Sequence, residues 1–164
     1  YSQASIDMAR RLIKQFGMDS MVTFARCDIS EGLPYPPDSF DKIVCADFIE
    51  HINDDQKNKL LDEVHRLLKP GGRAVIFTPN LLRERLGAFK GLMRGVFGGA
   101  ACETRLHFGL TSRFSFERKL RKRGLGYKRV FLDAQRPYLP KIPVLKEALS
   151  LNLLWVVEKK GYND

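Results

Sequence analysis

Two short apolar runs joined by one amphipathic pattern constrain the fold most. The first run ends at Ala46 and gives way to a polar cluster, and the second covers residues 75–78. Between them Asn53 and Gln56 are spaced as a helix N-cap and its partner, and Pro70-Gly71-Gly72 ends the pattern. Apolar residues at helical spacing fill the interval: Leu60, Leu61, Val64, Leu67 and Leu68. This order predicts strand, helix and strand, with a ligand site where the first strand ends.

The rest of the chain continues the alternation of helices and strands. The pattern predicts helices over residues 2–16 and 112–123 and strands over 21–25, 42–46, 73–78, 127–132 and 153–158. Residues 81–97 also carry apolar side chains at near-helical spacing. We therefore expect an α/β fold with a mostly parallel sheet and helices on both faces.

Length and composition narrow the class of protein. A chain of 164 residues with 44% apolar content is enough for one domain with a buried core. No stretch has the roughly 18 consecutive apolar residues of a membrane-spanning helix. Cys27, Cys45 and Cys102 lack the spacing of metal ligands, which favours a reducing compartment, and we expect a cytoplasmic protein.

The net charge of +9 is concentrated in one segment. Residues 81–129 hold 13 basic and 3 acidic side chains, whereas residues 1–80 hold 10 and 12. Such a segment suits an anionic partner, such as a phosphate-bearing or lipid-like molecule, and a solvated basic face explains it equally well. The basic cluster of residues 118–123 has no accompanying aromatic RNA-binding signature, so we do not expect nucleic acid as a partner.

The sequence FDKIVCADFIEHI from Phe40 to Ile52, with RLLKPGG at residues 66–72 and TPN at 78–80, carries a family resemblance. It resembles the second half of class I S-adenosylmethionine-dependent methyltransferases of the small-molecule type, close to methyltransferase type 11. The resemblance implies a Rossmann-like fold, one domain over residues 1–164, and a cap-like insertion at about 81–110 for substrate recognition. An amphipathic helix within it could be a lid, a dimer surface, an interfacial helix or a part of the core.

In this family two strands and a glycine-rich turn precede the segment that Tyr1 opens. The resemblance therefore implies that the sequence is N-terminally incomplete, lacking the turn that holds the methionine part of the cofactor and the acid that binds its ribose. We expect the chain from Tyr1 alone not to bind S-adenosylmethionine usefully. We also expect its sheet to be completed by another molecule or by preceding residues.

The resemblance also implies a cofactor site. It assigns Asp28 to the adenine amino group, Ile29 to one face of the ring and Tyr1 to the other. Ala46, Asp47 and Phe48 would line the cofactor and acceptor pockets. A carboxylate is suited to accept a hydrogen bond from an exocyclic amine. The alternative for Asp28 is a solvated turn residue or helix cap, and for Asp47 it is a local cap.

His51 and Asp47 are the candidates for catalysis. Transfer from a sulfonium needs alignment and, for a hydroxyl or amine acceptor, removal of a proton, which a histidine performs well near neutral pH. An alternative is a divalent metal bound by Asp47, Glu50, His51 and His107, as in catechol-type and small-RNA ribose methyltransferases. Those enzymes have Glu where this chain has Asp47, and many relatives with Glu-His at this place use no metal.

The expected function is methyl transfer from S-adenosylmethionine to a small molecule. Two alternatives are a methyltransferase-like domain that binds without catalysis and an RNA ribose methyltransferase. The residues do not identify the acceptor.

Overall fold

The computed structural model describes residues 2–80, 109, 111–130 and 152–161. The chain divides into two compact units, residues 1–35 and residues 36–164. Residues 81–97, whose apolar side chains have near-helical spacing in the sequence, lie outside the part of the chain that the structure describes. We treat each unit by itself.

The first unit is built around α1 (Gln3–Gln15), followed by the 3-10 turn η1 (Asp19–Met21). Gly17, at φ 66°, follows the end of α1, and the Arg10 guanidinium lies 5.9 Å from the centre of the Phe24 ring. The helix confirms the prediction for residues 2–16. The strand predicted at 21–25 is wrong, because residues 22–28 pair with no strand among the described residues.

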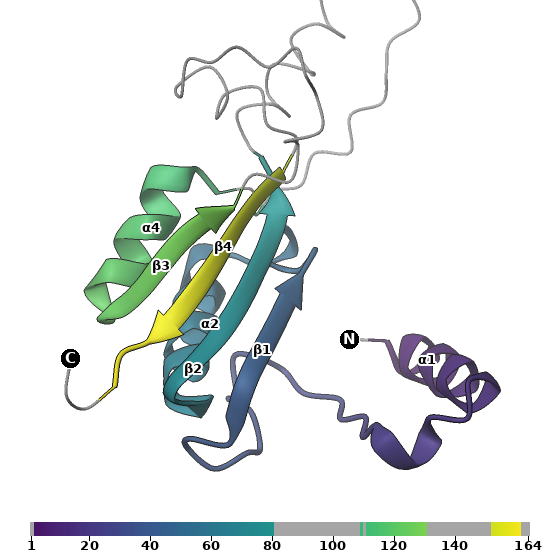
Figure 1. The fold of residues 1–164 in the computed structure, drawn as a ribbon. Helices are drawn as coiled ribbons and strands as arrows, with labels where there is room; N and C mark the ends of the chain where they lie inside the picture. The colour runs from purple at the N-terminus through teal and green to yellow at the C-terminus, as the bar shows by residue number, and fades with distance from the viewer. Residues whose placement is uncertain (1, 81–108, 110, 131–151, 162–164) are drawn as a thin grey trace, which may run out of the picture. The chain divides into compact units, whose positions relative to one another are not determined.

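The second unit holds a four-stranded sheet in the order β1-β2-β4-β3 (Figure 1). Its strands are β1 (Phe40–Ala46), β2 (Leu68–Pro79), β3 (Leu125–Val130) and β4 (Asn152–Lys159). β1 and β2 are parallel, and β4 runs antiparallel to both β2 and β3. The α/β class is confirmed, and the sheet is mixed because β4 inserts between β2 and β3 in the opposite direction.

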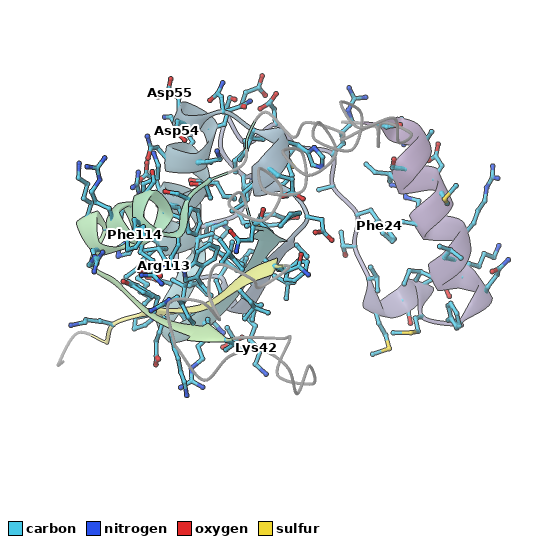
Figure 2. All side chains as sticks on the ribbon, turned by 90° about the horizontal axis from the view of Figure 1, so that it is seen from above. Phe24, Lys42, Asp54, Asp55, Arg113 and Phe114 are labelled. Atoms are coloured by element: carbon cyan, nitrogen blue, oxygen red, sulfur yellow. The ribbon has the colours of Figure 1, made fainter. Side chains whose placement is uncertain are left out.

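The helix α2 (Asp54–Leu67) begins as the sequence predicts. The Asn53 side chain accepts from the Gln56 N–H at 2.9 Å, and the Gln56 side chain accepts from the Asn53 N–H at 3.0 Å, which completes a capping box. Asp54 and Asp55 extend from the first turn (Figure 2), where carboxylates stabilise the helix dipole. The cap sets where the loop after β1 ends.

The helix α4 (Arg113–Lys122) lies on the same face of the sheet as α2. Its N-cap Ser112 accepts from the Ser115 N–H at 3.2 Å, and Gly124 stands at φ 68° just after its end. The Arg123 Nε donates to the Asp62 Oδ1 of α2 at 2.6 Å. These contacts hold the two helices side by side over the sheet.

The core lies between the sheet and these two helices. Phe116 of α4 packs on Trp155 of β4 with ring centres 4.7 Å apart, and both side chains are buried. Buried residues of β2 and β4 complete the layer, namely Ala74, Ile76, Leu153 and Val157. The opposite face is less covered: Val44 of β1 is 74% exposed.

The turn at residues 70–72 interrupts β2. The strand begins at Leu68 rather than at residue 73, since Leu68 pairs with Phe40 and the pairing resumes at Arg73 opposite Lys42. Gly71 takes φ 75°, and a Cβ on Gly72 would lie 2.8 Å from the Lys69 carbonyl oxygen. The two glycines therefore allow a bulge between two paired segments.

Among the described helices, none combines the length and apolarity needed to cross a membrane.

Candidate functional site

The polar cluster of the sequence forms a tight turn at the carboxyl end of β1. Asp47 follows the strand at φ 49°, and its N–H donates to the Phe77 carbonyl oxygen of β2 at 3.2 Å. A 3-10 turn, η2 (Ile49–His51), comes next, and its Ile49 is fully buried. The exposed Asp47 and half-buried Phe48 thus stand on a turn anchored by apolar packing.

Glu50 points inward from this turn. Only 2% of its surface is exposed, and its Oε2 accepts from the Thr78 Oγ1 of β2 at 3.1 Å. Its backbone carbonyl accepts from the Gly109 N–H at 2.9 Å. Burial raises the pKa of the nearby Cys45 thiol to about 12, and the Glu50 charge adds to that rise.

His51 points the other way. Its side chain is 54% exposed and its Nε2 lies 3.9 Å from the Glu50 Oε1, while the backbone N–H of His51 donates to the Phe48 carbonyl oxygen at 3.0 Å. The structure therefore gathers Ala46, Asp47, Phe48 and His51 at one end of β1, where an open α/β sheet presents its ligands. An exposed imidazole there can accept a proton from a nearby hydroxyl or amine group.

The described residues contain no group of three or more His, Cys, Asp or Glu side chains arranged to hold a metal ion. Of the four ligands considered, Glu50 is turned into the core toward Thr78. His107 lies outside the described residues.

The residues expected at the adenine belong to the first unit. The Asp28 Oδ1 accepts from the Ser30 N–H at 2.8 Å, and this hydrogen bond holds the pKa of the carboxyl below its usual value. An exposed, ionised carboxylate fits the chemistry of an acceptor for an adenine amine. Ile29 is 4% exposed, so its side chain is not open to a ring here, and Tyr1 lies outside the described residues.

Sequence reasoning missed two residues that contact the turn, Thr78 of β2 and Gly109. Thr78 is the polar exception in the apolar run of β2, which is a usable signal for a buried partner. A Cβ on Gly109 would lie 2.5 Å from the carbonyl oxygens of both Glu50 and Ile52. No local pattern reveals such a close approach between distant segments.

The comparisons with known proteins agree with this architecture. Residues 1–72 match the family model described as a methyltransferase domain. Methyltransferase GfsG of Streptomyces halstedii is 33% identical over 75 residues, which cover 46% of this chain and 26% of that protein. The ubiquinone/menaquinone biosynthesis C-methyltransferase UbiE of Escherichia coli is 29% identical over 75 residues, covering 46% of this chain and 29% of that protein.

A solved structure shares the fold along nearly the whole chain. It is geranyl diphosphate C-methyltransferase from Streptomyces coelicolor, in complex with Mg²⁺, geranyl diphosphate and S-adenosyl-L-homocysteine. The TM-score is 0.61 at 18% identity, over 97% of this chain and 62% of that one. The family model and the relatives agree with the resemblance seen in the sequence: over the matched region this chain is similar to class I S-adenosylmethionine-dependent methyltransferases of the small-molecule type.

Proposed function

We propose that the protein transfers a methyl group from S-adenosylmethionine to a small-molecule acceptor. The observation that carries the proposal is the turn after β1, which places Asp47, Phe48 and His51 at the end of a parallel strand of a methyltransferase-like sheet. The matched region spans 26% and 29% of the two curated relatives, so the activity of the whole protein belongs to this proposal.

The predicted cofactor-binding residues have the following roles in the proposed reaction. Asp28 accepts from the adenine amino group, and Ile29 and Tyr1 contact the two ring faces. Because Ile29 is buried here, its contact requires a local rearrangement. Ala46, Asp47 and Phe48 line the cofactor and acceptor pockets.

The bound cofactor supplies an activated methyl group on a sulfonium. The acceptor atom forms its bond to this carbon as the bond from carbon to sulfur breaks, which leaves S-adenosylhomocysteine. His51 receives the acceptor proton and passes it to solvent, which its half-exposed ring allows. Asp47, exposed on the same turn, is the second candidate for that proton.

The acceptor we propose is anionic or lipid-like. The support is the excess of basic residues within 81–129, which includes the cap-like insertion assigned to about 81–110. The structural neighbour from Streptomyces coelicolor was solved with geranyl diphosphate, a molecule that is both. We take the insertion and the remaining residues 1–164 as parts of one methyltransferase domain.

Turnover assays on two histidine variants test the proposal. The intact protein is incubated with methyl-labelled S-adenosylmethionine and the small-molecule extract of its source cells, with geranyl diphosphate as a defined probe. We expect His51→Ala to lower labelled product by about a hundredfold, within the usual range for a lost proton acceptor, with unchanged affinity for S-adenosylhomocysteine. The matched control, His65→Ala in α2, should keep the wild-type rate. No labelled small molecule from the wild-type protein would contradict the proposed activity.

A further inference from the structure

We propose that Glu50 is a positioning residue whose buried carboxylate fixes the turn that presents Asp47 and His51. The geometric part of this proposal stands on the structure of the second unit. Its catalytic consequence rests on the proposed function, because only a working His51 makes its placement matter for turnover.

The carboxylate ties the turn to the neighbouring strand. Glu50 and Thr78 are 28 positions apart in the chain, and both side chains are buried where the Thr78 Oγ1 donates to the Glu50 Oε2 at 3.1 Å. Two residues before η2, the Asp47 N–H donates to the Phe77 carbonyl oxygen. The end of β2 therefore holds the chain on both sides of Asp47 and Phe48.

Gly109 contacts the backbone of the same turn. Its N–H donates to the Glu50 carbonyl oxygen at 2.9 Å, and a Cβ at this position would meet the carbonyl oxygens of Glu50 and Ile52 at 2.5 Å. Only glycine fits this approach without displacing the turn. Gly109 thus contacts the backbone of Glu50 while Thr78 contacts its side chain.

Burial separates the role of Glu50 from that of its neighbour. His51 is 54% exposed and Glu50 is 2% exposed, although their side-chain atoms lie within 3.9 Å. A carboxylate sealed in the core and directed at Thr78 does not reach an acceptor at the surface. Glu50 consequently acts through the position of the turn rather than by touching a substrate.

A matched pair at Thr78 tests the geometry without any ligand. Thr78→Val keeps the shape of the side chain and removes the donor, whereas Thr78→Ser keeps the donor. In the intact protein labelled at histidine, the Cε1–Hε1 signal of His51 is recorded at pH 9, where imidazoles are neutral. We expect Thr78→Val to shift this signal beyond its line width and Thr78→Ser to leave it in place, with the His65 signal constant in both.

Gly109→Ala is the second variant, and it should also shift the His51 signal while His65 stays constant. A His51 signal that is the same in Thr78→Val and wild type would overturn the proposal. A His51 signal unchanged by Gly109→Ala would overturn the part of the proposal in which Gly109 helps to position the turn. If one variant unfolds, the other still decides the question, since each acts on the turn from a different side.

The turnover of two Glu50 variants then shows whether this side chain acts by its shape or by its charge. Glu50→Gln keeps an oxygen that accepts from Thr78, so we expect it to retain the wild-type rate, whereas Glu50→Ala should lose about a hundredfold, as a small misplacement of a reacting group can. Equal losses in the two variants would show that Glu50 acts by its charge and would overturn its positioning role. A shifted His51 signal with full turnover would support the positioning of the turn by Glu50 and contradict the catalytic role proposed for His51.

Discussion

At the scale of single residues, the buried thiol of Cys45 makes the stability of the protein depend on pH. Its pKa of about 12 lies far above that of an unfolded thiol, near 8.5, so between these values the unfolded state binds fewer protons. Stability therefore falls as pH rises above about 8.5. We expect wild type to lose up to about 1.4 kcal/mol per pH unit more than Cys45→Ala between pH 9 and 11. Urea titrations at pH 7, 9, 10 and 11 measure this, and parallel pH curves for the two proteins would show that the thiol titrates normally.

Glu117 of α4 gives a second prediction at this scale. Its buried carboxylate accepts from the Tyr127 hydroxyl at 3.1 Å and the Trp155 Nε1 at 3.3 Å, and it forms an ion pair with the Arg129 Nε at 3.1 Å. Glu117→Gln places an amide donor among these donors and should cost about 1–3 kcal/mol of unfolding free energy. The control Glu158→Gln disturbs an exposed pair with Arg73 and should cost less than about 1 kcal/mol. Equal effects would mean that the Glu117 contacts contribute no more than a surface pair.

At the scale of elements, the helix caps predict unequal effects of one substitution. The Ser112 side chain caps α4, whereas Ser2 occupies the N-cap position of α1 without a side-chain hydrogen bond. Ser112→Ala should lower the unfolding free energy by about 1 kcal/mol, and Ser2→Ala should leave it unchanged. Urea unfolding followed by circular dichroism compares them. A similar loss in both variants would refute the assignment of the Ser112 cap.

Elements with local signals could be predicted from the sequence, and those that depend on distant partners could not. Asn53 with Gln56 and Ser112 with Gly124 mark helix ends within a few residues, and both helices begin where these patterns place them. Residues 21–25 are apolar enough for a strand, but a strand also needs a partner. Likewise, the family resemblance offers Glu50 only as a ligand in an alternative metal site, and only the fold brings Thr78 to its carboxylate.

At the scale of the whole molecule, the two outer strands of the sheet differ in their protection. Among the described residues β1 pairs only with β2, and its Val44 is 74% exposed, whereas β3 carries Lys128 and Arg129. Charges on an edge strand oppose association with other chains. For residues 1–164 alone, we expect Val44→Lys to reduce concentration-dependent light scattering more than Val130→Lys does. An equal effect of the two substitutions would show that β1 is not the associating edge.

Cofactor binding by the intact protein is the most direct test of the central claim. Isothermal titration with S-adenosylhomocysteine should show saturable binding to wild type. It should be weaker by roughly 1–2 kcal/mol for Asp28→Ala, the usual cost of losing one partner of a buried hydrogen bond, and unchanged for Asp19→Ala, a control on the same unit. Unchanged affinity in Asp28→Ala would restrict Asp28 to its turn with Ser30. Absence of binding to the wild-type protein would contradict the account of this chain as a methyltransferase.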